Sequence, residues 1–240
     1  MAPSVHRGPL EGRLALVTGA SRGIGAATAL ALAARGAHVV LTARTAKGLE
    51  DVEQAIFDAG GAATIAPLDL TQTDAIAKLG TAIAGRWDAL DVLVLNAATL
   101  GSLASVPAID PKELASVLTL NVSAQAALLA AFDPLLGKST GARVIALTSS
   151  VARTPRAYWG GYGASKAAFE TLVAAYGDEV AEVSRIRTAI LDPGATRTTM
   201  RARAYPGEDP VSVKDPAIVA ERIAELAVQG FDAGHFERVG

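Results

Sequence analysis

The chain has 240 residues, of which 50% are hydrophobic, 19% are charged and 5% are aromatic, and its formal net charge is -2. This length is ample for one domain and short for two, and the near-neutral charge gives no basic footprint for nucleic acid. The chain has no cysteine, which excludes disulfides, thiolate metal ligands and cysteine nucleophiles, and we expect no metal site.

The first 12 residues predict a flexible tail. They lack the apolar core of a secretory signal, and no later stretch offers about 18 uninterrupted apolar residues. We therefore expect a cytoplasmic protein without a membrane segment.

Short apolar runs alternate with helical patterns along the rest of the chain. Strands are predicted at residues 13–19, 37–43, 63–69, 91–97, 143–150 and 186–194, with a final one in HFERVG at 235–240. Helices are predicted at 23–35, 45–59, 72–87 and 111–132, and from the stretch at 149–171 to about Glu182.

This alternation predicts an α/β fold. Successive βαβ units give a Rossmann-type, doubly wound parallel sheet of about seven strands with helices on both faces, in a single domain over residues 13–240. Ligands of such sheets bind beyond the carboxyl ends of the strands, so the residues that follow each strand are the candidate site.

The first predicted strand ends in TGASRGIG, residues 18–25. Glycines between a strand and a helix let backbone N–H groups approach a pyrophosphate, and the helix N-terminus adds partial positive charge. The alternative is a tight connection without a ligand. The candidate cofactor-binding residues of this loop are Gly19, Ser21, Arg22, Gly23, Ile24 and Gly25.

Tyr162 and Lys166 lie four positions apart in a predicted helix, and so on one face of it. A free phenol has a pKa near 10, and a nearby ammonium group lowers the pKa of a phenol by stabilising the phenolate. We therefore expect Lys166 to lower the pKa of Tyr162, which would make the phenol a general acid and base. The alternative is an exposed helical pair without a chemical role.

Several motifs in chain order resemble the short-chain dehydrogenase/reductase family. They are TGxxxGIG, Asp69 after the third strand, NAA at 96–98, Asn121 in the long helix, YxxxK at 162–166 and PG at 193–194. The resemblance covers residues 13 to about 200. It implies a small-molecule carbonyl or alcohol substrate and a homodimer or homotetramer.

The resemblance also implies roles for individual residues. The catalytic set would be Asn121, a serine, Tyr162 and Lys166. Either Ser149 or Ser150 fits the serine, and we expect Ser150 because it is anchored to the strand end. Further cofactor-binding residues would be Asp69, Leu70, Asn96, Ala97, Tyr162, Lys166, Pro193, Gly194, Thr196 and Thr198.

The second strand predicts which dinucleotide binds. NAD sites usually carry an acidic residue there for the ribose 2′-hydroxyl, but this strand ends in Ala43 followed by Arg44. Arg44, with Arg22 and Lys47, would instead bind a 2′-phosphate. We expect NADP(H).

These observations together predict an NADP(H)-dependent carbonyl reductase or alcohol dehydrogenase. The alternative is a non-catalytic NADP(H)-binding regulator or scaffold, and a sugar-nucleotide epimerase is disfavoured by the short C-terminal region. Residues 195–213 would form a substrate lid. Its arginines, Arg197, Arg201 and Arg203, would recognise an acidic group or be ordinary solvated charges.

Overall fold

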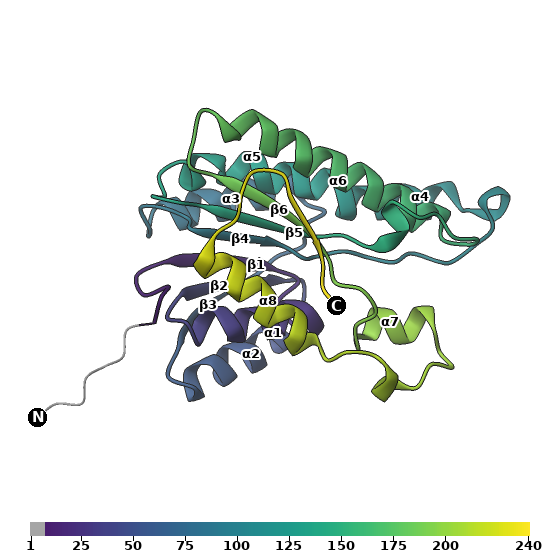
Figure 1. Ribbon diagram of the computed structural model, residues 1–240, viewed down its shortest axis with the longest axis horizontal. Coiled ribbons are helices and arrows are strands. Elements are labelled where there is room, and N and C mark those ends of the chain that lie inside the picture. Colours follow the sequence, from purple (N-terminus) through teal and green to yellow (C-terminus); the bar gives the residue numbers. More distant parts are fainter. Residues whose placement is uncertain (1–7) are drawn as a thin grey trace, which may run out of the picture.

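Seven parallel strands form one sheet in the order β3-β2-β1-β4-β5-β6-β7 (Figure 1). The computed structural model describes residues 8–240. The strands are β1 (Leu14–Thr18), β2 (His38–Ala43), β3 (Ala62–Pro67), β4 (Val92–Leu95), β5 (Arg143–Leu147), β6 (Arg187–Asp192) and β7 (His235–Arg238). The predicted fold class and the final strand are confirmed.

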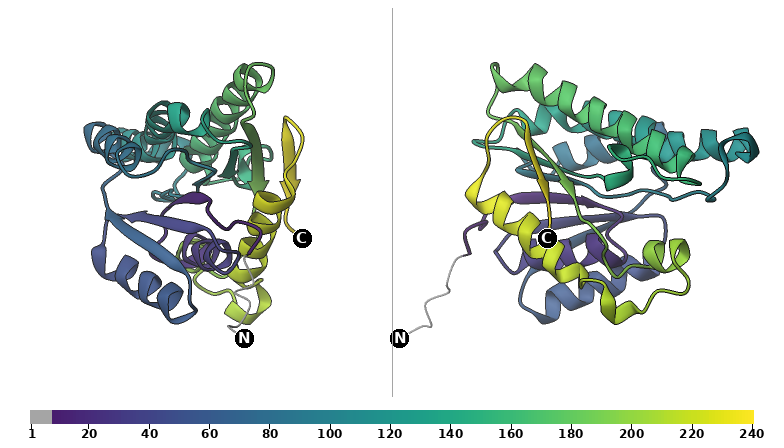
Figure 2. Two further views of the ribbon diagram at one scale, coloured as in Figure 1. Left: turned by 90° about the vertical axis from the view of Figure 1, so that its left-hand side faces the viewer. Right: turned by 45° about the vertical axis from the view of Figure 1, so that its right-hand side comes forward.

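Helices cover both faces of this sheet (Figures 1 and 2). One layer contains α1 (Gly23–Ala33), α2 (Ala46–Asp58) and α8 (Pro216–Gln229). The other contains α3 (Thr73–Ala84), α4 (Pro111–Leu118), α5 (Ala124–Leu136) and α6 (Gly160–Ala181). The short α7 (Thr199–Ala204) stands apart from both layers at the right of Figure 1.

Alternation along the strands divides the core into two clusters. In β1, Ala15 and Val17 pack with α1, α2 and α8, whereas Leu14 and Leu16 pack with α3, α5 and α6. Successive side chains of a strand point to opposite faces, so a strand buried on both faces must be apolar at nearly every position. This explains the continuous apolar runs in the sequence.

The strand order reverses between β1 and β4. The chain moves outward from β1 through β2 to β3 and then returns to place β4 on the other side of β1. Crevices at such a reversal, beyond the carboxyl ends of the strands, are where open α/β sheets bind ligands. The glycine-rich loop follows β1 directly and therefore lies at this position.

The helix predicted within residues 149–171 begins later than expected. Strand β5 ends at Leu147, a short 3-10 turn, η3, follows at Ser150–Ala152, and α6 starts at Gly160. Pro155 disfavours helical backbone at the residue before it, and Tyr158 has a φ of 72°, which no helix accommodates. Residues 153–159 therefore form a loop.

The long helix predicted at 111–132 contains a π-helical turn. This turn, η2 (Thr119–Ser123), joins α4 to α5. By length and composition Pro111–Leu136 could span a membrane, but Leu128 and Phe132 of α5 are fully buried in the core beside α3. The apolar side chains of α5 therefore fill part of the core.

Part of the predicted flexible tail is packed. Leu10 is 5% exposed, and its backbone N–H donates to the Arg35 carbonyl at the end of α1. Leu10 is therefore anchored to the core, although Pro9, Glu11 and Gly12 around it are exposed. Residues 1–7 of the predicted tail lie outside the described residues.

Candidate active site

Tyr162 and Lys166 lie in the first two turns of α6 and are almost fully buried, with exposures of 7% and 4%. The Lys166 Nζ donates to the carbonyl oxygen of Leu147 at 2.7 Å. Because Leu147 is the last residue of β5, this bond holds the start of α6 against the carboxyl end of the sheet. The predicted pair thus lies where the fold places its ligands.

Burial governs the ionisation of both groups. It lowers the pKa of Lys166 to about 8, an effect that the nearby Glu170 carboxylate partly opposes. Burial also raises the pKa of Tyr162, the Asp192 carboxylate raises it further, and a hydrogen bond with Ser149 acts in the opposite direction. Without the cofactor, burial and the Asp192 carboxylate thus keep the pKa of the phenol high, and the expected lowering by Lys166 stays a prediction for the cofactor-bound protein.

The serine next to the phenol is Ser149. Ser149 is extended, with φ -157°, and lies close enough to the Tyr162 hydroxyl to lower its pKa, whereas Ser150 begins η3 and its Oγ accepts from Arg156 at 3.3 Å. The side chain of Thr148, on the opposite side of the extended chain, reaches Glu170. These contacts favour Ser149 over the expected Ser150, because the turn rotates Ser150 away from the phenol.

Asn121 lies buried in the π-helical turn η2. Its Oδ1 accepts from Thr99 N, and its Nδ2 donates to Thr99 O and to Ser165 Oγ, at 2.8 to 2.9 Å. Ser165 in turn donates to the Tyr162 carbonyl at 2.7 Å. Asn121 therefore ties the loop after β4 to the helix that carries Tyr162. The sequence did not predict a role for Thr99 or Ser165; Thr99 follows the NAA motif at 96–98, and Ser165 lies inside the YxxxK motif at 162–166.

The glycine-rich loop is held by contacts across the strand reversal. Gly19 and Gly23 have φ values of 65° and 57°, which favour glycine. Asn96 Nδ2 donates to the carbonyls of Thr18 and Gly19 at 2.7 and 3.3 Å. Thr18 Oγ1 accepts from the backbone N–H groups of Asn96 and Ala97 at 2.9 and 3.0 Å. Sequence analysis missed Thr18, which ends the strand inside the core.

The backbone of this loop fits a dinucleotide. A Cβ at Gly25 would lie 2.3 Å from the Gly19 carbonyl oxygen, so the helix start and the loop approach as closely as glycine allows. Ser21 packs against Gly48, and the side chain of Ile24 packs on the core. At Ile24 the backbone N–H, and at Ser21 the backbone N–H and the hydroxyl, can therefore meet a pyrophosphate.

Two arginines flank the far end of the loop. Arg22 and Arg44 are both exposed, and neither forms an ion pair with a carboxylate of residues 8–240. Lys47, by contrast, pairs with Asp51. The two free guanidinium groups suit a 2′-phosphate.

Asp69 and Leu70 lie after β3, near Arg44. The Asp69 carboxylate accepts from the backbone N–H and the hydroxyl of Thr71, which lowers its pKa, and Arg44 contributes to that lowering. Leu70 is buried beneath this turn. The carboxylate of Asp69 is exposed at the edge of the crevice, where it can also meet a ligand.

The residues after β6 meet the glycine-rich loop. Gly194 has a φ of 63° and donates its N–H to Asp192, and Thr196 Oγ1 donates to the Pro193 carbonyl. A Cβ at Gly23 would lie 3.3 Å from the methyl group of Thr198, which caps α7. The structure thus brings the glycine-rich loop and residues 193–198, both predicted to bind the cofactor, next to each other.

Two of the three lid arginines are paired with carboxylates, one inside the lid and one at the start of α8. Arg197 pairs with Asp215, and Arg201 forms two hydrogen bonds with Glu208. Arg203 is exposed on α7. The pairing of Arg197 and Arg201 favours a role in holding the lid over one in recognising an acidic group.

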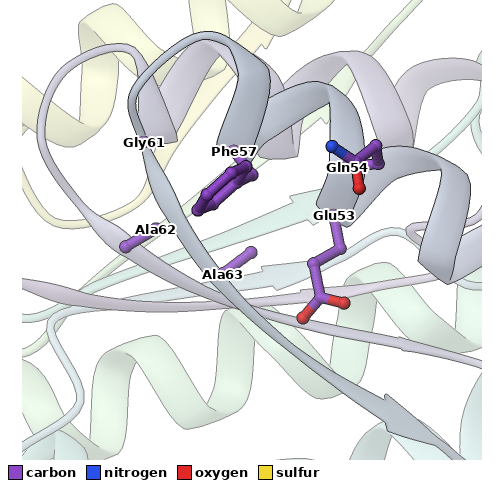
Figure 3. Close-up of a pocket in the computed structure, with 6 residues that line it drawn as sticks. All are labelled: Glu53, Gln54, Phe57, Gly61, Ala62 and Ala63. Atoms are coloured by element: carbon purple, nitrogen blue, oxygen red, sulfur yellow. The ribbon is translucent and has the colours of Figure 1, made fainter.

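Apolar side chains surround the approach to Tyr162. Leu100 and Val151 are buried against it, and Trp159 lies edge-on to it with ring centroids 6.1 Å apart. A hollow of about 280 Å³ opens nearby and is lined by Val151, Arg156, Trp159 and Gly163, but Tyr162 itself does not line it. A larger hollow, about 500 Å³, lies between α2 and the edge strand β3 (Figure 3). It contains none of the residues discussed above, so we place the candidate site at Tyr162.

Comparison with known proteins agrees with these features. Residues 13–209 match the family model described as short chain dehydrogenase. The uncharacterized oxidoreductase YciK of Escherichia coli K12 is 37% identical over 211 residues, which cover 87% of this chain and 83% of that protein.

Solved structures resemble the whole chain. A protein from Pseudomonas syringae described as a short chain dehydrogenase has a TM-score of 0.93 at 37% identity, covering 99% of this chain and 98% of its own. Another, from E. coli CFT073, was crystallised with NADPH and has a TM-score of 0.90 at 35% identity, covering 97% and 98%.

The close approach of Gly25 to Gly19 yields a test. We expect Gly25→Ala to lower the free energy of unfolding by about 1–3 kcal/mol, because backbone must move to admit the methyl group, and to weaken NADPH binding at least tenfold. Urea unfolding and a fluorescence titration with NADPH measure the two effects.

Gly207→Ala is the matched control. A Cβ there meets nothing within 4 Å, so we expect a change of less than about 0.5 kcal/mol. Equal behaviour of the two variants would contradict the role of the close approach.

Proposed function

This chain belongs to the short-chain dehydrogenase family, and from that premise we propose that it is an NADP(H)-dependent oxidoreductase that interconverts a carbonyl compound and a secondary alcohol. The observation that carries the proposal is Tyr162, which is buried in the first turns of α6 together with Lys166 and has Ser149 near its hydroxyl, at the carboxyl end of β5. A binding protein has no need of a buried phenol and ammonium group at this position. This argues against the alternative of a regulator or scaffold.

NADP(H) is favoured over NAD(H) by the charges at the adenosine end. Strand β2 ends at Ala43 without a carboxylate, and Arg22 and Arg44 are free to bind the 2′-phosphate. The crystallised relative from E. coli CFT073 binds NADPH. The glycine-rich loop, Asp69, Asn96 and Thr198 would hold the remainder of the cofactor.

The reaction combines a hydride and a proton. The cofactor, when bound, supplies a hydride to a carbonyl carbon or accepts one from an alcohol carbon. In reduction, Tyr162 donates its phenolic proton to the carbonyl oxygen while the Ser149 hydroxyl hydrogen-bonds that oxygen. In oxidation, the phenolate takes the hydroxyl proton back.

The raised pKa of Tyr162 suits the reductive direction. The phenol is protonated at neutral pH and ready to donate, and the ammonium group of Lys166 stabilises the phenolate that forms. Asn121 positions this pair through Ser165, and we propose that the π-helical turn around Asn121 leaves room for a proton path to Lys166.

We further propose a cytoplasmic homodimer or homotetramer. The support is the family, and the long α5 and α6, which lie in the same outer layer (Figure 1). Light scattering after size-exclusion chromatography measures the assembly directly.

Tyr162→Phe tests the proposed function. We expect kcat/KM for reduction of an aldehyde and ketone panel to fall about 100-fold to 10,000-fold, since the proton donor is removed, while NADPH binding persists. Tyr176→Phe is the matched control, because Tyr176 lies on the same helix and its hydroxyl bonds Asp133, far along α6 from Tyr162. Equal turnover by the wild type and Tyr162→Phe would refute the proposal.

Ser149 and Ser150 can be separated by substitution. We expect Ser149→Ala to lower kcat about 100-fold, because the carbonyl oxygen loses a hydrogen-bond donor, whereas Ser150→Ala keeps kcat within about threefold, since Ser150 does not touch that oxygen. The reverse order of effects in steady-state assays would restore the assignment to Ser150.

The buried ammonium group predicts a pH dependence. The pKa of Lys166 is lowered to about 8, so its charge is present below this pH and is lost as the pH rises through it. We expect kcat for reduction to fall above about pH 8, while Tyr162 stays protonated. A pH profile from 6 to 10 measures this effect, and a flat profile up to pH 9.5 would show that the Lys166 charge is not required.

A further inference from the structure

Arg156 lies beside the proposed active site, in the loop between η3 and α6. Its Nη2 donates to Ser150 Oγ at 3.3 Å, one residue from Ser149, and its Nη1 donates to Tyr205 Oη at 3.4 Å. Tyr205 directly follows α7 of the lid. The guanidinium group therefore links Ser150 in η3 to Tyr205 in the lid.

The charge of Arg156 is not neutralised locally. The neighbouring arginines are paired, Arg153 with Glu170 and Arg201 with Glu208. Within residues 8–240, the side chain of Arg156 makes two long hydrogen bonds to neutral hydroxyls and forms no ion pair. A carboxylate could replace both hydroxyls with stronger, charge-assisted bonds.

The surroundings of Arg156 are apolar and aromatic. The ring of Trp159 lies 5.8 Å from that of Tyr205 and 6.1 Å from that of Tyr162. Leu103 and Met200 pack against the same cluster. The Arg201 guanidinium also lies over the Tyr205 ring, but it is paired with Glu208, so Arg156 is the charged group of this cluster without a carboxylate partner. Such a group can fix the orientation of an apolar ligand.

We propose that Arg156 binds a carboxylate of the substrate, and that the substrates are keto acids and hydroxy acids with a flat, apolar body. This rests on the proposed function, since Tyr162 marks the position of the carbonyl. The carboxylate lies several atoms from the carbonyl, because Arg156 contacts Ser150 and not Ser149. One guanidinium group matches a single negative charge, which favours a carboxylate over a phosphate ester.

Three rigid ketones test the proposal with NADPH. They are 4-acetylbenzoate, its neutral methyl ester and acetophenone. We expect the wild type to show a kcat/KM at least tenfold higher for the acid than for the ester. Arg156→Gln should reduce this ratio to near one, a loss of tenfold to about 100-fold that is typical of a hydrogen-bonded charge. Arg156→Lys should retain part of it.

Arg203→Gln is the matched control. It removes the same charge from exposed α7 and should keep the acid-to-ester ratio. A ratio near one in the wild type, an unchanged ratio in Arg156→Gln, or an equal loss in Arg203→Gln would each overturn the inference. Turnover of acetophenone would leave the proposed function standing in all three cases.

A binding measurement separates the two proposals if no ketone is reduced. Titration of the NADP⁺-loaded protein with benzoate, followed by tryptophan fluorescence, reports on Trp159, whose backbone N–H donates to the Arg156 carbonyl. Benzoate binding that is at least tenfold weaker in Arg156→Gln would support the carboxylate site at Arg156. The lack of ketone reduction would then count against the proposed oxidoreductase function alone. Benzoate binding that is absent or independent of Arg156 would overturn the inference.

Discussion

The site depends on burial of the Lys166 ammonium group at the end of β5. An ammonium group removed from water is costly unless it is hydrogen-bonded, and here the Leu147 carbonyl accepts from it. That bond joins the last residue of the strand to the second turn of α6 and so fixes Tyr162, one turn earlier, next to Ser149. The position of Tyr162, the proposed acid, therefore follows from the hydrogen bond that the buried Lys166 ammonium group requires.

Burial also determines the protonation states of Tyr162 and Lys166. Desolvation disfavours the charged form of each, so it raises the pKa of the phenol and lowers that of the ammonium group. The Asp192 carboxylate, which holds the Gly194 N–H at the other side of the crevice, adds to the effect on Tyr162. The result is a neutral phenol beside a charged amine at neutral pH, which suits donation of a proton to a carbonyl.

Two segments outside the two helix layers, loop 153–159 and the lid, complete the site. Loop 153–159 carries Arg156 and Trp159, and the lid places Tyr205 against both. The start of the lid also packs on the glycine-rich loop through Thr198. The lid thus contacts both the cofactor end and the substrate end of the crevice. A ligand that moves the lid at one end is therefore expected to change ligand binding at the other end.

The sequence by itself determined the sheet, the helix layers, the glycine-rich loop and the Tyr162–Lys166 pair, because each is specified by local periodicity or by spacing within one turn of a helix. It could not place the start of α6 after the loop at Pro155. Only the tertiary structure favoured Ser149 over Ser150, paired Arg197 and Arg201 with carboxylates and left Arg156 without an ion pair in the described residues. Those outcomes depend on desolvation and on contacts between residues far apart in the chain, as between Tyr162 and Asp192 or Arg156 and Tyr205, which a local pattern does not encode.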